Sequence, residues 1–346
     1  MLEYWILFIS ILLCFIFVRG ESPKTPIIFY TIIICEVLLG GLRGLSVGTD
    51  TNHYVSILQS ISKGDSLKYS YVTSRDSAFW NIYGCIYMFF KNYTFVFILH
   101  SLLNWSMVSS SIKRISTNCF LALLVYISFR YSDMHLSGMR QGIAMAFIIY
   151  SFKYVLERNV WKYIFIILVS AIFHKSALIA FPLYWIFQYD IKKIPPLYIF
   201  ILMGIFFFAR HILYNNLFSL LLQNDTYDVY LKTTYEHGYL YYILYLVAFI
   251  LCYIFHDKED EQSGKFLLLA FVGILLQSIT LANPIFNRVS VYFTVSFVFL
   301  IPRVYSYNSS RYGMQVPTLF VSVFLIGLYA LGGPAPGIVP YKFFWE

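Results

Sequence analysis

A loop whose residue types suit anion binding follows the second long apolar run of the chain. It begins at Arg43 and reads RGLSVGTDTNHY, with Thr49 and Asp50 near its centre. Backbone N–H groups in such a loop, together with the Arg43 guanidinium, can hold a diphosphate. The alternative is a plain helix end and turn, in which Gly44 and Gly48 adopt a positive φ and Asp50 caps the next helix.

One acidic residue, Glu36, lies inside the second apolar run itself. It precedes Arg43 by seven residues, so in a helix the two side chains lie near one face and two turns apart. A carboxylate within a membrane-length run indicates a functional site, and a buried pair with a basic residue is the equally open alternative.

A second polar cluster opens a later apolar run. The sequence HLSGMRQGIAMA starts at His135 and places Arg140 and Gln141 at the beginning of a predicted helix. Arginine suits a diphosphate because its planar guanidinium binds two oxygens at once and stays charged. A basic side chain that only reaches the membrane surface is the alternative. Small side chains at this helix start let neighbouring helices approach closely; they are Gly142, Ala144 and Ala146.

Two further polar breaks interrupt apolar sequence. His174 and Lys175 lie between two apolar runs, and a histidine can take a hydroxyl proton near neutral pH. Asn287 and Arg288 stand at the start of another run, with Tyr292 one turn beyond them. A solvated turn and an interfacial anchor are the respective structural alternatives.

The composition requires a membrane as the main solvent. Of the 346 residues, 59% are hydrophobic and 12% are charged, and the mean hydropathy is +0.69, outside the range of soluble proteins. The net charge of +8 comes from basic residues scattered between apolar runs, which argues against nucleic-acid binding. The five cysteines show no C-x-x-C spacing, so neither a zinc site nor a disulfide framework is predicted.

The apolar runs predict an all-α, polytopic integral membrane protein, with residues 1–346 forming a single transmembrane domain. Roughly 20 helical residues cross a hydrocarbon core about 30 Å thick, and this length gives about twelve transmembrane helices. They are expected near residues 4–18, 25–42, 93–112, 117–130, 139–156, 160–173, 176–189, 196–213, 238–256, 265–282, 286–305 and 317–333. The short run 77–90 is predicted to be re-entrant or interfacial.

The positive-inside rule orients the chain, provided that 77–90 does not cross and the chain turns back at 174–176. The basic residues of the short loops then gather on one side, predicted to be cytoplasmic: Arg19, Lys24, Lys113, Arg114, Lys153, Arg158, Lys162, Lys192, Lys193, Lys258, Lys265, Arg303 and Arg311. The polar clusters fall on the opposite face, with loops at about 43–78 and 214–237. No cytoplasmic connection is long enough for a nucleotide-binding domain, so ATP-driven transport and nucleotide-sugar chemistry are not expected.

Together, the polar clusters resemble the EpsG family of Wzy-type polysaccharide polymerases. The family pattern R-x-x-x-x-G-T-D corresponds to residues 43–50, R-Q-x-x-A to 140–144, F-H-K-S-A to 173–177 and N-R to 287–288. The resemblance implies a multi-pass, GT-C-like glycosyltransferase of the bacterial cytoplasmic (inner) membrane, acting on O-antigen, capsule or exopolysaccharide precursors. Its implied partners are an undecaprenyl-diphosphate-linked donor and acceptor, the lipid bilayer and a chain-length regulator. Neither a cofactor nor a metal ion is expected.

The resemblance also suggests how the residues divide the reaction. Basic side chains would hold the donor diphosphate and stabilise the charge that develops as the anomeric C–O bond breaks; these are Arg43, Arg140, Lys175 and Arg288. His174, or alternatively Asp50 or His135, would deprotonate the acceptor hydroxyl. Transfer would be direct, because no pair of outer-face carboxylates suits a covalent mechanism. Further candidates for the site are Glu36, Thr49, His135, Gln141, Asn287 and Tyr292.

Three other functions fit parts of the pattern. An O-antigen ligase uses a similar donor and outer-face basic residues but passes the chain to lipid A core. A flippase or transporter should line a midplane path with charged residues and show two related halves, whereas the polar residues here cluster at one face. A membrane acyltransferase should place an intramembrane histidine next to a carboxylate or an asparagine.

Overall fold

Helices account for the regular structure of the protein. The computed structural model describes residues 1–18, 25–64, 77–221 and 238–346. Within these ranges no strand occurs, apart from an isolated bridge between Arg43 and Phe343, so the all-α prediction is confirmed there. The chain divides into two units, residues 1–181 with 318–346 and residues 182–317. One transmembrane domain for residues 1–346 stays a prediction.

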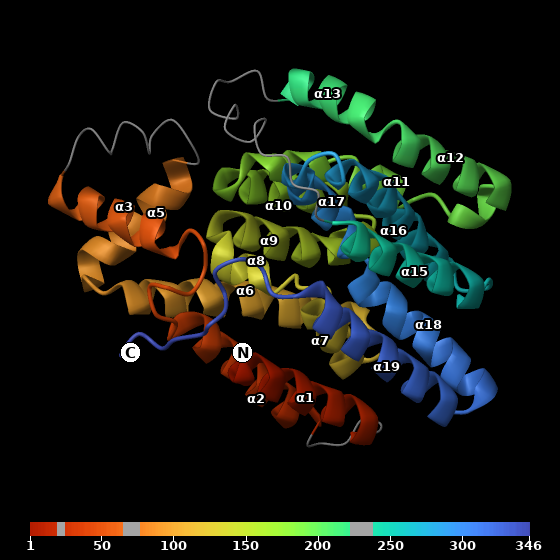
Figure 1. The fold of residues 1–346 in the computed structure, drawn as a ribbon, viewed down its shortest axis with the longest axis horizontal. Helices are drawn as coiled ribbons and strands as arrows, with labels where there is room; N and C mark the ends of the chain where they lie inside the picture. Colours follow the sequence, from red (N-terminus) through yellow and green to blue (C-terminus); the bar gives the residue numbers. More distant parts are fainter. Residues whose placement is uncertain (19–24, 65–76, 222–237) are drawn as a thin grey trace. The chain divides into compact units, whose positions relative to one another are not determined.

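The helices of the first unit pack both against neighbours in the sequence and against helices farther along the chain (Figure 1). Its elements are α1 (Leu2–Phe17), α2 (Thr25–Gly41), α3 (Thr51–Lys63), α5 (Ser77–Phe90), α6 (Tyr93–Ile115), α7 (Cys119–Ser128), α8 (Asp133–Ser137), α9 (Met139–Leu156), α10 (Val160–Phe173), the 3-10 helix η1 (Lys175–Ala180) and most of α19 (Gln315–Gly332). Helix α6 packs against both α2 and α9, and α10 packs against α9 and α5. The start of α9 and the end of α10 therefore lie at the same end of this unit.

Asparagine side chains start α6, α7 and α10. Asn92 Oδ1 accepts from the backbone N–H of Thr94 at 2.8 Å, Asn118 accepts from the N–H three residues on at 2.9 Å, and Asn159 does the same at 3.1 Å. These caps satisfy N–H groups that the first turn of a helix leaves unpaired. Short polar turns thus separate the apolar runs without leaving backbone groups unsatisfied.

Small residues bring α9 close to its neighbours, as the sequence predicts. A Cβ atom on Gly142 would meet the Met134 carbonyl oxygen at 2.7 Å, so glycine is required for α8 to lie this close. Ser170 Oγ, in α10, donates to the Ala144 carbonyl oxygen at 2.9 Å. These contacts hold α8 and α10 against the first turns of α9, where Arg140 lies.

The second unit is also helical. Its elements are α11 (Leu183–Ile186), the 3-10 helix η2 (Ile191–Lys193), α12 (Pro196–Phe208), α13 (Arg210–Leu221), α15 (Tyr239–Phe255), α16 (Glu261–Thr280), the 3-10 helix η4 (Pro284–Phe286), α17 (Asn287–Thr294) and α18 (Phe297–Tyr312). Helix α16 contacts α12, α15, α17 and α18 and is the central element of this unit.

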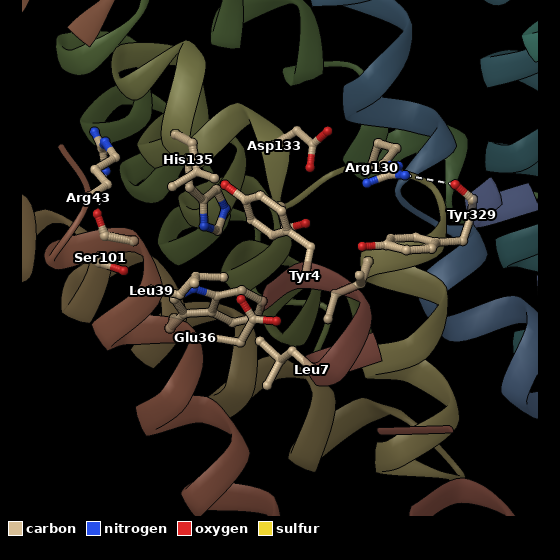
Figure 2. Close-up of a pocket in the computed structure, with 15 residues that line it drawn as sticks. Tyr4, Leu7, Glu36, Leu39, Arg43, Ser101, Arg130, Asp133, His135 and Tyr329 are labelled. Carbon is tan, nitrogen blue, oxygen red and sulfur yellow. Dashed lines mark hydrogen bonds between the residues drawn. The ribbon is translucent and has the colours of Figure 1, made fainter. Parts of the chain in front are cut away.

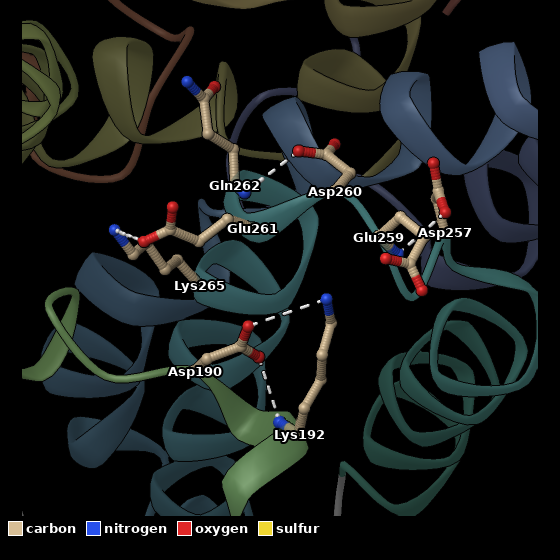
Figure 3. A network of polar contacts seen from close by, with 8 residues as sticks. All are labelled: Asp190, Lys192, Asp257, Glu259, Asp260, Glu261, Gln262 and Lys265. Atoms are coloured by element: carbon tan, nitrogen blue, oxygen red, sulfur yellow. Dashed lines mark hydrogen bonds and ion pairs between the residues drawn. The ribbon is translucent and has the colours of Figure 1, made fainter.

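A polar network holds the start of α16 (Figure 3). Asp260 caps this helix, and its carboxylate also pairs with Arg303 Nη1, which the figure does not draw, at 3.3 Å. Nearby, Asp190 pairs with Lys192 at 3.7 Å, and Lys265 makes its own ion pair one turn into α16. Three basic residues that the positive-inside rule assigns to one side therefore lie at one end of this unit.

Three helices of the described residues are long and apolar enough to cross a membrane: α6 with 23 residues, α16 with 20 and α19 with 18. Two bent stretches add one span each if each is counted as a single crossing, α12 with α13 and η4–α17 with α18. The prediction of about twelve spans is not confirmed. Helix α7, for example, has 10 residues and is about 15 Å long, half the thickness of a hydrocarbon core.

Three predicted spans are not single straight helices. Residues 176–189 contain η1 and α11, which Pro182 helps to separate because proline has no backbone N–H to donate. Residues 196–213 bend by 70° after α12, where Arg210 Nη1 donates to the Phe207 carbonyl oxygen at 2.7 Å. Residues 286–305 are divided between α17 and α18, with a bend of 46°.

Both predicted outer loops contain helix. Helix α3 occupies Thr51–Lys63 of the loop at about 43–78, and α13 continues to Leu221 in the loop at 214–237. The remainder of these loops, residues 65–76 and 222–237, lies outside the described residues.

Candidate functional site

Arg43 follows the last turn of α2 and is completely buried, with 0% of its surface exposed. Its Nη1 donates to the Gly40 carbonyl oxygen at 2.6 Å, and its guanidinium lies 4.2 Å from the centre of the Phe97 ring. Burial lowers the pKa of Arg43 to about 10, so the side chain stays charged at neutral pH. Its Nε and Nη2 have no hydrogen-bond partner in the described part of the chain. An acceptor at these two N–H groups would remove a cost of burial.

A cavity of about 30 Å³ adjoins Arg43 in the first unit. Figure 2 shows Tyr4, Glu36, Asp133 and His135 around it. Glu36 is buried, as the sequence predicts, but no ion pair joins it to Arg43 among the described residues. The volume holds about two water molecules, so in this conformation the cavity is too small for a sugar or a diphosphate.

His135 lies on the cavity wall but is a weak base. Its Nε2 is 2.6 Å from the Tyr126 hydroxyl, and its ring packs edge-on to Trp105. Burial, and secondarily the charge of Arg43, lower the pKa of His135 to about 3. Since a general base works best with a pKa near the operating pH, His135 is a poor candidate for this role at neutral pH.

A pair of hydroxyl side chains joins the first two polar clusters. Thr49 Oγ1 lies 2.8 Å from Ser137 Oγ, and the Thr49 backbone N–H donates to the same oxygen at 3.2 Å. Gly48 has a φ of +96°, and a Cβ there would meet the Leu136 carbonyl oxygen, so the turn requires glycine. The loop at Arg43 and the segment at His135 therefore form one surface.

The backbone donors of the first cluster are already occupied. The Gly44 N–H donates to the Lys342 carbonyl oxygen at 2.8 Å, and the Gly48 N–H donates to the Gly337 carbonyl oxygen at 2.7 Å. In this conformation the N–H groups of Gly44 and Gly48 are therefore bonded within the chain, and their use by an anion stays a prediction. Gly44 does not have a positive φ; it is small because Phe343 packs directly against it.

Arg140 is half-buried at the start of α9, followed by the buried Gln141. Its guanidinium lies 5.7 Å from the centre of the Trp80 ring. Arg140 and Asp50 both lie close to Tyr54. Burial raises the pKa of Tyr54, the positive charge of Arg140 lowers this pKa, and the negative charge of Asp50 raises it further. Asp50 makes no side-chain capping bond to α3, which removes support for its purely structural alternative.

His174 ends α10 and is half-buried, and Lys175 after it is exposed. The preceding Phe173 belongs to the same apolar cluster as Met139 and Tyr54. Since Met139 directly precedes Arg140, the structure brings the third predicted cluster to the same end of the first unit as the first two.

The fourth cluster lies in the second unit. Tyr292 is completely buried, and Arg288 is half-buried at the start of α17. Ser290 Oγ donates to Gln277 Oε1 at 2.6 Å and lies 3.4 Å from Asn287 Oδ1. Participation of Asn287, Arg288 and Tyr292 in the site formed by the first unit stays a prediction.

Comparison with known proteins decides the family. The model of the EpsG family matches residues 26–343, a range that includes all the polar clusters. The chain belongs to the EpsG family. This family is Wzy-type polymerase-like, so the resemblance drawn from the motifs is confirmed. No match was found among curated proteins or among solved structures.

Membership in the EpsG family, together with the apolar helices, identifies an integral membrane protein with a polysaccharide-polymerase type of function. Within the described residues of this EpsG chain, no group of three or more His, Cys, Asp or Glu side chains is placed to hold a metal ion.

Two charged residues at the cavity, Asp133 and Arg130, lie outside the family motifs of this EpsG chain. Asp133 Oδ2 accepts from the Ala335 N–H at 2.8 Å, and Arg130 Nη2 donates to the Tyr329 carbonyl oxygen at 2.7 Å. Burial raises the pKa of Asp133 to about 6. Their partners lie about 200 residues away in the sequence, so no local pattern predicts the contacts. The available signal was two charged residues, three positions apart, in the polar turn between two predicted spans.

Proposed function

We propose that this protein polymerises lipid-linked polysaccharide repeat units. It transfers the glycan of an undecaprenyl-diphosphate-linked donor to a sugar hydroxyl of the next lipid-linked repeat, at the outer face of the bacterial cytoplasmic membrane. Family membership supports the class of reaction. The observation that carries the site is that three family motifs, residues 43–50, 140–144 and 173–177, meet at one end of the first unit.

The arginines suit the donor diphosphate. Arg43 carries two buried N–H groups without a partner in the described residues, and these fit phosphate oxygens. Arg140, half-buried beside an aromatic ring, presents a second guanidinium. Positive charge at these positions stabilises the leaving diphosphate as the anomeric C–O bond breaks. The exposed Lys175 adds a positive charge in the same unit, and Arg288 stays a predicted member of the set.

His174 is the proposed general base. It is half-buried next to the apolar cluster that also adjoins Arg140, whereas His135 has a pKa of about 3. In the transfer, the acceptor oxygen forms the new bond to the anomeric carbon, the diphosphate leaves with the electron pair of the old bond, and the hydroxyl proton passes to His174. Asp50 is the alternative base.

The proposal includes the membrane arrangement that the sequence predicts. The protein is multi-pass, with about twelve GT-C-like spans in the cytoplasmic (inner) membrane, and a chain-length regulator is its protein partner. The glycan belongs to an O-antigen, a capsule or an exopolysaccharide. The end of the first unit that carries the motifs faces outward, because Arg114 and Glu157, which pair at 3.7 Å, lie in the opposite predicted loops.

The test is glycan chain length in a deletion strain complemented with wild type, Arg140→Ala or His174→Ala, with membrane levels checked by immunoblot. We expect wild type to restore a ladder of long chains. Both variants should leave short glycan at normal protein levels, because each removes a group that acts on the reacting atoms. Arg114→Ala is the matched control, since an exposed ion pair contributes little.

Other outcomes identify other functions. Repeat units that accumulate untransferred inside the cell in the deletion strain indicate a flippase. Loss of even the single capped repeat indicates a ligase. Long chains in the deletion strain itself contradict any role in polymerisation.

A further inference from the structure

The C-terminal segment, residues 333–346, lies across the loop that carries Arg43. The Phe344 N–H donates to the Leu42 carbonyl oxygen at 2.9 Å, and the Gly44 N–H donates back to Lys342 at 2.8 Å, on either side of the bridge between Arg43 and Phe343. The segment thus pairs with the loop as a short antiparallel ladder. All of these residues belong to the first unit.

A second set of bonds extends this cover to the end of the loop. The Gly48 N–H donates to the Gly337 carbonyl oxygen at 2.7 Å, and Thr49 Oγ1 donates to the Pro336 carbonyl oxygen at 2.7 Å. Tyr341 adds a bond from its hydroxyl to the second helix, at 2.7 Å from the Leu39 carbonyl oxygen. Carbonyl oxygens of the C-terminal segment therefore occupy the donors that a phosphate would use.

The cover leaves no room for a diphosphate. Arg43 has 0% of its surface exposed, and the adjoining cavity of about 30 Å³ holds about two water molecules. A methyl group on Gly44 would already lie 2.9 Å from the Phe343 carbonyl oxygen. Yet Nε and Nη2 of Arg43 have no hydrogen-bond partner among the described residues, although the segment is bonded to the backbone on both sides of Arg43. A permanent cover would leave this buried cation incompletely bonded, whereas a removable one lets a ligand complete it.

The segment is built to move as a unit. It has no regular helix or strand after α19, and most of its residues are at least partly exposed, with Ile338 and Tyr341 as its buried anchors. Gly333 and Gly337 have φ values of +64° and +78°, which gives the backbone two flexible points. Phosphate oxygens accept hydrogen bonds roughly twice as strong as those of neutral carbonyls. A diphosphate can therefore replace the carbonyls on the same donors.

We propose that the C-terminal segment is a built-in competitor for the diphosphate, and that it leaves loop 42–49 when the lipid-linked donor binds. The proposal rests on the proposed function for the identity of the anion. The segment shields Arg43 from water and from other anions until the donor arrives.

The first experiment locks the segment. Leu42 and Phe344 lie directly opposite each other in the ladder, and Cα atoms of such a pair are typically within the range of a disulfide. Both residues are therefore replaced by cysteine, as Leu42→Cys and Phe344→Cys. Membranes of the deletion strain that contain the double variant and their own lipid-linked repeats are oxidised, with or without later reduction. We expect at least a tenfold loss of polymer on oxidation and recovery on reduction. The single-cysteine variants, and the wild type with its five native cysteines, should respond to neither treatment.

Full polymerisation by the oxidised, cross-linked protein would overturn the proposal. Wild type that makes no polymer under any condition would instead contradict the proposed function. Because one protein sample is assayed before and after reduction, recovery of activity shows that the double variant is folded.

The second experiment needs no polymerase activity. Ile338 has 1% of its surface exposed, so Ile338→Cys reacts with a maleimide only when the segment lifts. Inorganic diphosphate should raise its labelling rate severalfold, because it competes for the donors of Gly44 and Gly48. Thr318→Cys, in the same unit but outside the segment, is the control and should label at one rate throughout. An unchanged rate for Ile338→Cys at saturating diphosphate contradicts competition. If diphosphate raises the labelling rate but no assay detects polymer, the segment competes with an anion and the proposed polymerase function is wrong.

Discussion

Replacing Arg43 by methionine should separate stability from activity. Methionine keeps most of the length and the apolar contacts of the arginine stem but carries neither charge nor donors. We expect Arg43→Met to fold at normal levels and to lose polymerisation. If Arg43 only stabilises the fold, the variant should instead be less stable and keep normal activity per folded molecule.

The magnitude follows from the contacts of the guanidinium. The bond to Gly40 at 2.6 Å is worth ~1.5–3 kcal/mol as a charged hydrogen bond, and the contact with Phe97 is worth ~0.5–2 kcal/mol. Against these gains, the unpaired Nε and Nη2 cost about 1–3 kcal/mol each. The terms nearly cancel, so the free energy of unfolding should change by less than ~1 kcal/mol. Loss of donors that stabilise the leaving group should lower turnover roughly 10²–10³-fold.

The assay compares thermal unfolding in detergent with polymer formed per molecule in membranes. Arg130→Met is the matched control in the same cavity. Its guanidinium donates to the Tyr329 carbonyl oxygen at 2.7 Å and lies 3.8 Å from the Tyr329 ring. The control should lose stability and keep polymer formation per folded molecule. If Arg43→Met instead unfolds several degrees earlier and polymerises normally, Arg43 is a structural residue and the argument from its unpaired donors fails.

Two further predictions concern stability. Burial raises the pKa of Asp133 to about 6, so the folded protein holds this proton more tightly than the unfolded chain, and the free energy of unfolding should fall as pH rises from about 4 to 6. Asp133→Asn keeps an acceptor for the Ala335 N–H and should raise the melting temperature at pH 8 but not at pH 4; equal shifts would contradict this. Asp260→Ala removes a helix cap and the Arg303 pair and should cost about 1–2 kcal/mol, measured by thermal unfolding. Asp257→Ala, which loses only an exposed turn bond, should cost less than ~0.5 kcal/mol, and equal losses would refute the role of Asp260.

Local sequence patterns were enough to predict the all-α fold and the close contacts made by small residues. Gly142 and Ala144 lie at positions where α9 meets α8 and α10, because helical spacing and side-chain size are both visible in the sequence. Helix breaks were harder to predict. Hydropathy and the charge pattern together predicted a span at 176–189, whereas Pro182 and the short turns around it divide this range.

Contacts between distant parts of the chain could not be predicted. The loop at Arg43 has the glycines and donors of an anion site, and its pattern is the same whether those donors are open or covered. The segment that covers it follows about 290 residues later, and its bonds use backbone atoms, which carry no residue-specific signal. The lack of partners for Nε and Nη2 of Arg43 likewise depends on how the surrounding residues pack. The residue type alone indicated only a positive charge.

The position of the cavity favours chemistry on a lipid-linked substrate over transport. A transporter binds its cargo near the middle of the membrane, between broken helices. In the first unit, several residues of the cavity lie where helices start or end: Tyr4 is in the first turn of α1, Arg43 follows α2, and Tyr329 is in the last turn of α19. Glu36, five residues before the end of α2, also lines the cavity. In the proposed function, the lipid of the donor stays in the bilayer, and cations at helix ends would reach the bond to the diphosphate without a path through the protein.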